Sequence, residues 1–256
     1  MHSNQPRESD HGLERLVGLS ENPSPALRIQ PLRRLIKQTG ELDRDRLLIH
    51  EIYASIQGES THAGKPCVFV RTAVCHLRCR YCDTPQAFTG GTILSVREVM
   101  QRVQSFGISL VEITGGEPLL QPAVPRLMTR LCDRGMRVLL ETSGAVGIDR
   151  VDRRVCIIVD VKTPGSSEVE RNRWRNLDVL WPGCEVKFVI CDAADYVFAK
   201  RVLEQHRLHE RVPVLFSPEA GGMSGARLAE WIVRDRLPVR LQLQLHKVLW
   251  GDRPGV

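Results

Sequence analysis

Apolar and polar positions along this chain predict an alternation of strands and helices that begins at residue 47. Short runs rich in β-branched residues predict strands at 47–56, 67–72, 108–113, 136–141, 155–161, 184–191, 212–216 and 239–245. Apolar residues at helical spacing predict helices that open at Ser95 and cover 123–134, 167–177, 194–207 and 224–236. Strands that alternate with helices indicate an α/β fold with a parallel sheet.

The ends of these elements carry their own signals. Ser95 is followed three residues later by Glu98, the pattern of a capping box, and Gly135 follows the helix predicted at 123–134. Polar segments stand after four predicted strands, at 114–118, 141–144, 160–164 and 217–218. A βα barrel builds its active site at the carboxyl ends of its strands. Because the chain has fewer than the eight strand–helix units of a complete barrel, we expect a partial (incomplete) TIM-like barrel.

Residues 1–46 differ from the rest of the chain. They are polar, carry both charges and contain four prolines, which predicts a disordered N-terminal extension. The remainder, 47–256, is expected to form one domain around a single core.

Composition narrows the function classes. The formal net charge of +6 is dispersed rather than gathered in a stripe, so we expect affinity for anionic small molecules and no direct nucleic-acid binding. No apolar run approaches the length of a membrane span. Five of the eight cysteines stand in or beside apolar runs and are expected to be buried thiols rather than disulfides, which predicts a reduced, cytoplasmic setting.

The other three cysteines, Cys75, Cys79 and Cys82, are separated by three and two residues. Iron–sulfur clusters normally take four cysteine thiolates. Three thiolates can therefore hold three irons of a four-iron cluster and leave the fourth iron open to another molecule. From the residues alone, the alternative is a zinc site completed by His76 or His62, although zinc ligands usually come as two separated pairs.

Two levels of family resemblance follow from these motifs. The cysteine loop together with Gly115-Gly116-Glu117-Pro118 resembles the radical S-adenosylmethionine (SAM) superfamily. Four further segments, at 52–59, 69–71, 81–84 and 244–247, resemble the family of 7-carboxy-7-deazaguanine synthases, and this likeness covers about residues 47–256. It implies conversion of 6-carboxy-5,6,7,8-tetrahydropterin to 7-carboxy-7-deazaguanine with loss of ammonia, in queuosine and deazapurine biosynthesis.

The resemblance also implies cofactors and the residues that hold them. A [4Fe-4S] cluster on Cys75, Cys79 and Cys82 would bind SAM, and Thr84 would be a ligand of Mg²⁺. The implied SAM contacts are Tyr81, Cys82, Asp83, Gly116, Glu117, Ser143, Asp160, Lys162 and Ser217. Read without the family, Thr84 and Asp83 fit ordinary capping residues, and the strand-end residues fit solvated loop polarity.

Substrate contacts and partners are implied in the same way. The implied substrate residues are Ile56, Gln57, Gly58, Glu59, Arg71, Thr114 and His246. Arg71 would hold the pterin carboxylate, because a guanidinium fork suits a carboxylate. The family further implies an electron donor such as flavodoxin and a homodimer. The alternative activity is that of another small radical SAM enzyme, such as a glycyl-radical activase.

Two departures from the family pattern stand out. Val74 occupies the position directly before the first cysteine, where the family often has glycine. The chain also continues for ten residues past His246, and the sequence does not place this tail in the pocket.

Overall fold

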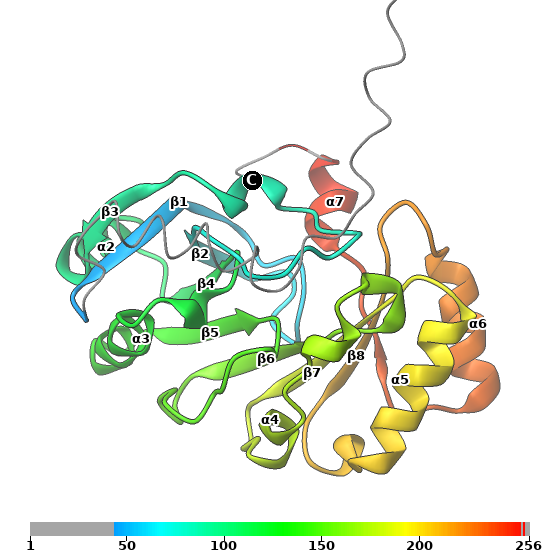
Figure 1. The fold of residues 1–256 in the computed structure, drawn as a ribbon. Helices are drawn as coiled ribbons and strands as arrows, with labels where there is room; N and C mark the ends of the chain where they lie inside the picture. Colours follow the sequence, from blue (N-terminus) through cyan, green and yellow to red (C-terminus); the bar gives the residue numbers. More distant parts are fainter. Residues whose placement is uncertain (1–43, 252, 254–256) are drawn as a thin grey trace, which may run out of the picture.

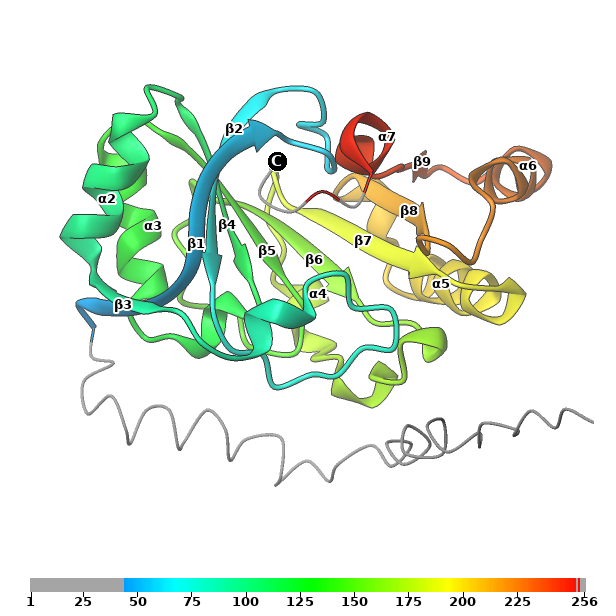
Figure 2. The same cartoon turned by 90° about the horizontal axis from the view of Figure 1, so that it is seen from above.

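A computed structural model describes residues 44–251 and 253, which form one nine-stranded sheet in the order β3-β1-β2-β4-β5-β6-β7-β8-β9. The sheet curves, with helices α2 to α6 on its outer side, whereas α7 lies on the other side (Figures 1 and 2). The elements are β1 (Arg46–Ile56), β2 (Pro66–Thr72), β3 (Thr92–Ser95), α2 (Val96–Ser105), β4 (Leu110–Gly115), α3 (Val124–Asp133), β5 (Arg137–Thr142), β6 (Cys156–Val161), α4 (Arg175–Asp178), β7 (Glu185–Ile190), α5 (Ala193–Gln205), β8 (Val214–Pro218), α6 (Gly225–Asp235), β9 (Arg240–Leu241) and α7 (Leu245–Trp250).

The direction of the strands confirms the predicted α/β partial barrel and corrects one part of it. Strands β2 and β4 to β9 are parallel, as expected, but β1 runs antiparallel to both β2 and β3. The reason lies in the short connection between β1 and β2, because a parallel pair needs a crossover of roughly a dozen residues or more. Residues 57–65, which make this connection, are called the β1–β2 loop below.

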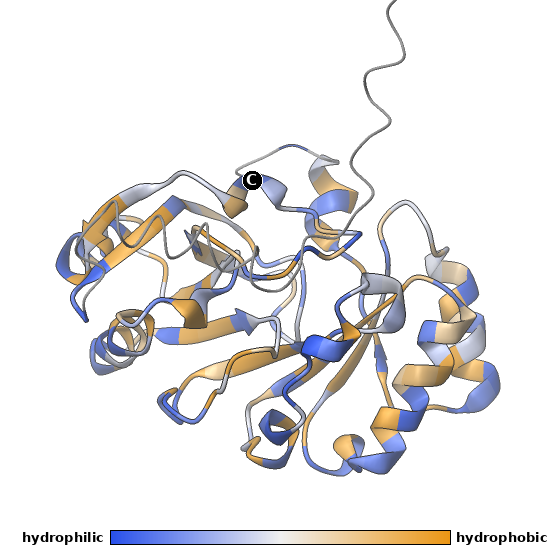
Figure 3. Cartoon of the chain, in the orientation of Figure 1, coloured by the Kyte–Doolittle hydropathy of each residue, from blue (hydrophilic) through white to orange (hydrophobic). Residues whose placement is uncertain are grey.

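The main hydrophobic core lies between the sheet and its outer helices. Helix α2 buries Val96, Val99, Met100 and Val103 at the predicted helical spacing, and Ser95 and Glu98 form the expected capping box. Hydrophobic colouring gathers on the strands and on the sides of the helices that face them (Figure 3). Each fully buried aliphatic side chain contributes roughly 1.5–3 kcal/mol, so this layer fixes the curvature that surrounds the site.

Two predicted elements are wrong. The helix predicted at 167–177 is a 3₁₀ turn, Val169–Arg171, and the short α4. Between them the Asn172 side chain bonds both the N–H and the C=O of Lys162, which competes with helical hydrogen bonding.

The strand predicted at 239–245 ends at Leu241, and the chain then turns into α7. The N–H of Leu245 donates to the Gly58 carbonyl, 2.9 Å away, so the chain leaves the sheet edge and packs on the β1–β2 loop. Strand β3 was not predicted.

The prediction of a disordered extension at 1–46 lies outside the described residues, except for the last three positions, of which Arg46 already begins β1. None of the helices in the described part of the chain is long and apolar enough to cross a membrane. All eight cysteines are free thiols in the structure. Of the five expected to be buried, Cys67 and Cys184 are buried, but Cys132, Cys156 and Cys191 are half-buried.

Candidate active site

The concave face of the sheet encloses a cavity of about 670 Å³. Its walls come from the cysteine loop after β2, from the ends of β4, β5, β6 and β8, from the β1–β2 loop and from α7. The predicted residues that line it are Ile56, Gln57, Gly58, Glu59, Arg71, Cys75, Cys79, Tyr81, Cys82, Asp83, Thr84, Thr114, Gly116, Ser143, Asp160, Lys162, Ser217 and His246. Glu117 is the one predicted site residue that does not.

The cysteine loop is held in place by its backbone. The N–H of Arg78 donates to the Glu168 carboxylate at 2.7 Å, and the N–H of Arg80 donates to the Ser166 carbonyl at 3.1 Å. Burial raises the pKa of the Cys75 thiol to about 12 and also raises the pKa of Cys79. Because iron binds thiolates, loading a cluster here releases protons.

The spacing of the three thiols argues against a zinc ion. Within the described chain, the set of His, Cys, Asp or Glu side chains whose ligand atoms all approach within 4.8 Å is His62, Cys156 and Glu185, not the loop thiols. Sulfurs around one tetrahedral zinc stand roughly 3.8 Å apart, from a Zn–S bond of about 2.3 Å. Neither His62 nor His76 lines the cavity. The wider thiol spacing fits a group of several metal atoms.

Val74, directly before the cysteine loop, is in the left-handed region with φ of +77°. A β-branched residue in this region is a strained outlier. Its carbonyl accepts from the N–H of Glu117 at 2.9 Å, and a Cβ on Gly116 would stand 2.2 Å from the same oxygen. The strained backbone is therefore clamped against the Gly-Gly segment, at the position where the family often has glycine.

Replacing Val74 by glycine is expected to leave the protein at least as stable as replacing it by alanine. Both changes remove a buried side chain, but only glycine relieves the left-handed strain of about 1–2 kcal/mol. At unstrained positions in regular structure, alanine is instead the more stable by roughly 0.5–1 kcal/mol. Urea unfolding of the two variants measures the order. If the alanine variant is instead more stable than the glycine variant by roughly 0.5–1 kcal/mol, Val74 is not strained.

Glu117 acts on the cavity through its neighbours. Its fully buried carboxylate accepts hydrogen bonds from Thr142 and from both the N–H and the hydroxyl of Ser143, at 2.5–3.0 Å. The carboxylate therefore orients Ser143, which does line the cavity. Thr142 was not predicted as a site residue.

Polar groups from the end of β6 and from the cysteine loop line the cavity. Lys162 and Asp160 form an ion pair at 2.7 Å, and burial and Asp160 have opposing effects that leave the pKa of Lys162 well above its ordinary value. The second oxygen of Asp160 and the hydroxyl of Tyr81 are buried with no hydrogen-bond partner. These two oxygen atoms can therefore take a hydrogen-bond partner from a polar ligand in the cavity.

Thr84 and Asp83 do not serve as plain caps. Thr84 precedes a 3₁₀ turn, yet its hydroxyl makes no cap hydrogen bond and lies 4.0 Å from the Cys82 sulfur. The carboxylate of Asp83 accepts from the side-chain amide of Gln244, at the start of α7, at 3.2 Å. Both side chains thus remain on the cavity wall.

The floor of the cavity holds a charged network of which only Glu59 and Gln57 were predicted as site residues. Buried Lys187 on β7 bonds the carboxylates of Glu59, at 2.8 Å, and Glu141. Burial opposes its charge, but these two carboxylates raise the pKa of Lys187 well above its ordinary value. Burial, followed by the charge of Glu141, raises the pKa of Glu112, which accepts from the Gln57 amide.

A signal for this network was present. Glu112, Asp160 and Lys187 each stand in the middle of an apolar strand, where a charged side chain must point to a site or a partner. The side chains of all three residues line the cavity.

Arg71 is already engaged. Its Nε donates to Glu51 at 2.6 Å and its Nη2 to the Tyr53 hydroxyl at 2.9 Å, which leaves Nη1 for a ligand. These contacts fix the plane of the guanidinium at the cavity wall.

His246 lies on α7 rather than on a strand, and it contacts the β1–β2 loop. A Cβ on Gly58 would stand 2.1 Å from its Nδ1, so glycine is required for this close approach. The Gln57–Glu59 segment and α7 close the cavity together.

This chain resembles known proteins both in the radical SAM superfamily and in the 7-carboxy-7-deazaguanine synthase family. A profile of the radical SAM superfamily matches residues 69–159. A 7-carboxy-7-deazaguanine synthase from Chlorobaculum tepidum is 47% identical over 214 residues, which cover 82% of this chain and 97% of that protein. One from Thermoplasma acidophilum is 38% identical over 212 residues, 82% of this chain and all of that protein. The crystal structure of QueE from Escherichia coli aligns with a TM-score of 0.62 at 22% identity, over 78% of this chain and 95% of that one.

Proposed function

Since the chain belongs to the 7-carboxy-7-deazaguanine synthase family of radical SAM enzymes, we propose that its cavity converts 6-carboxy-5,6,7,8-tetrahydropterin to 7-carboxy-7-deazaguanine with loss of ammonia. The observation that carries the proposal is the single cavity in which the three spaced thiols meet a separate polar floor. A glycyl-radical activase, the alternative, is not favoured, because it does not explain that floor.

Cys75, Cys79 and Cys82 would hold a [4Fe-4S] cluster, which supplies the electron that cleaves SAM to methionine and a 5′-deoxyadenosyl radical. Gly116 brings backbone groups close to the SAM amino acid, and Ser143, oriented by Glu117, offers a hydroxyl to it. The unpaired oxygen of Asp160 would accept a ribose hydroxyl. These residues bind and orient SAM beside the thiols.

The floor would hold the pterin ring. The ring edge carries N–H donors. The carboxylates of Glu59 and Glu141, both fixed by Lys187, would accept hydrogen bonds from them. Glu112, buried beside Gln57 and accepting from its amide, adds a further polar group to the floor. Thr114, Ile56 and His246 complete the wall around the ring.

Anaerobic incubation with SAM, a reductant, Mg²⁺ and the carboxylated tetrahydropterin, followed by mass spectrometry, tests the proposed activity. Release of 7-carboxy-7-deazaguanine and ammonia is expected. SAM cleavage without any product from the pterin would overturn the substrate assignment and leave the radical SAM chemistry intact.

Replacing Arg71 by alanine is expected to lower kcat/KM about tenfold to a hundredfold, because a charged hydrogen bond to the pterin carboxylate is worth roughly 1.5–3 kcal/mol. Arg71→Lys, which keeps the charge and loses the fork, is expected to lose less. Iron content and slow SAM cleavage without substrate should persist in both variants. An unchanged substrate Kd together with a lost cluster would instead make Arg71 a support of the cysteine loop.

Replacing Thr84 by valine is expected to raise the Mg²⁺ concentration needed for half-maximal activity by about tenfold or more, if its hydroxyl is a metal ligand. Mg²⁺ uses few protein ligands and completes its shell with water and substrate oxygens, so one hydroxyl beside the substrate suffices. Thr84→Ser keeps the ligand atom and serves as the control. Equal Mg²⁺ dependence in the two variants would remove Thr84 from the metal site.

The proposed radical SAM chemistry also requires a partner that supplies electrons. Cluster reduction needs a one-electron donor such as flavodoxin, and an oxygen-sensitive cluster suits a reduced cytoplasm. The proposed assembly is a homodimer, the commonest symmetric state.

A further inference from the structure

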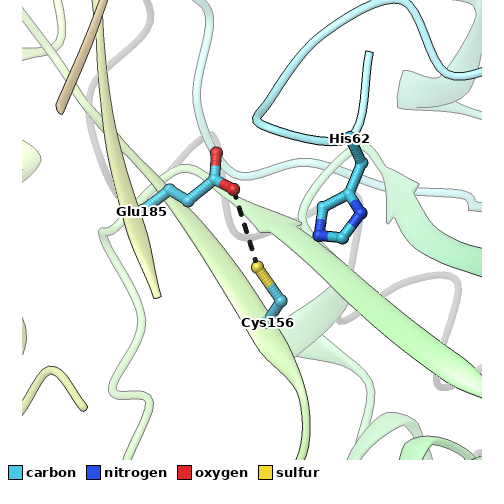
Figure 4. Close-up of side chains that lie close together, drawn as sticks. All are labelled: His62, Cys156 and Glu185. Atoms are coloured by element: carbon cyan, nitrogen blue, oxygen red, sulfur yellow. Dashed lines mark hydrogen bonds between the residues drawn. The ribbon is translucent and has the colours of Figure 1, made fainter. Parts of the chain in front are cut away.

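A second group of metal-ligating side chains lies at the opposite end of the barrel. Cys156 begins β6, Glu185 begins β7, and His62 comes from the β1–β2 loop. Their ligand atoms all lie within 4.8 Å of one another. Figure 4 shows the three side chains turned toward one another. None lines the catalytic cavity, and Ile158 separates Cys156 from Asp160 along β6.

The distances suit one small ion. The Cys156 sulfur lies 3.9 Å from Glu185 Oε1, close to the roughly 3.5 Å between sulfur and oxygen ligands of a tetrahedral zinc with bonds of about 2.3 and 2.1 Å. Thr61 orients the carboxylate, because its N–H donates to Glu185 Oε2 at 3.0 Å and its hydroxyl to Oε1. Such outer contacts fix the direction of metal ligands.

His62 lacks the partner that a buried imidazole needs. Its residue is 7% exposed, and its Nδ1 is buried with no hydrogen-bond partner. Leaving a buried polar atom unpaired costs about 1–3 kcal/mol. The backbone holds the ring in place nonetheless, because the N–H of His62 donates to Ser60 Oγ at 3.0 Å and Gly64 N–H closes the loop on the Gln57 carbonyl at 2.8 Å.

We propose that His62, Cys156 and Glu185 bind a zinc ion with water as the fourth ligand. Imidazole, thiolate and carboxylate are the three ligand types that zinc takes in proteins. On binding, the thiol proton passes to solvent and the sulfur becomes a ligand. The ion joins the β1–β2 loop to the first residues of β6 and β7, and so fixes the loop whose Gln57–Glu59 segment lines the catalytic cavity.

The test uses the full chain with its cluster in place, loaded with Zn²⁺, desalted, and assayed for zinc and iron. The wild type is expected to retain one zinc per chain. His62→Phe and Cys156→Ala should bind zinc at least about tenfold more weakly, and Cys132→Ala, another half-buried thiol, should match the wild type. A variant with Cys75, Cys79 and Cys82 all replaced by alanine should still retain one zinc, which separates the site from the cysteine loop.

Hydrogen exchange gives a readout that does not depend on catalysis. Zinc should slow exchange in residues 57–65 of the wild type and leave it unchanged in Cys156→Ala, whose fold the rest of the exchange map verifies. Zinc retained equally by His62→Phe and Cys156→Ala, or lost from the triple cysteine variant, would identify an adventitious ion only. No retained zinc in the wild type would exclude the site and leave the proposed activity untouched.

Discussion

Replacing Cys75, Cys79 or Cys82 by alanine is expected to abolish cluster assembly and, with it, all SAM cleavage. With only two thiolates left, a second iron loses its protein ligand, and clusters are held by such thiolates. The loss of SAM cleavage should exceed that caused by any other single substitution, because without the cluster no group remains to transfer an electron to SAM. Iron and sulfide content and 5′-deoxyadenosine release measure it.

Cys132→Ala is the matched control. Cys132 is a half-buried free thiol on α3 that does not line the cavity. Its variant should keep full cluster content and normal SAM cleavage. A Cys79→Ala protein that assembles a cluster and cleaves SAM at the wild-type rate would refute the ligand assignment.

Replacing Lys187 by methionine is expected to destabilise the fold by roughly 3–5 kcal/mol, because it leaves buried carboxylates without their counter-charge. Glu59 and Glu141 both bond this ammonium, and Glu112 is close enough for the charge of Lys187 to act on it. The free energy of unfolding in urea, measured without oxygen, gives the loss. Turnover of the pterin should fall as well, since the two carboxylates lose the group that orients them.

Lys200→Met provides the comparison at the surface. Lys200 pairs with Asp235 at 2.6 Å, but its side chain is 30% exposed, against 7% for Lys187. Partly exposed pairs contribute at most about 1 kcal/mol, so this variant should unfold almost as the wild type does. If Lys187→Met and Lys200→Met lower the free energy of unfolding by similar amounts, burial does not strengthen the contribution of the Lys187 network to stability.

Local patterns were enough to predict the outline of this fold, and tertiary contacts explain where they failed. The strands of the parallel sheet and helices such as α2 follow from periodicity and the Ser95–Glu98 cap. Helix 167–177 failed because Asn172 bonds the backbone of Lys162, ten residues earlier and outside the predicted helix. Strand 239–245 failed because Leu245 binds Gly58, which is far away in the sequence.

The candidate site divides in the same way. Residues in recognisable motifs, such as Cys75 and Gly116, were predicted and line the cavity. Lys187 and Glu141 were not, because each gains its meaning only when the barrel brings strands together. Glu117 was predicted as a SAM contact, but a sequence motif does not reveal that its carboxylate faces Ser143.

The contact between α7 and the β1–β2 loop has a consequence for how the protein is made. Gln244 bonds Glu59 across 185 positions of sequence, so one side of the cavity is synthesised long before the other. A nascent chain can form the early strands long before α7 emerges from the ribosome. The pocket is therefore completed by the last helix of the described chain, and a ribosome that stalls before residue 245 leaves a sheet whose catalytic chamber is still open on one side.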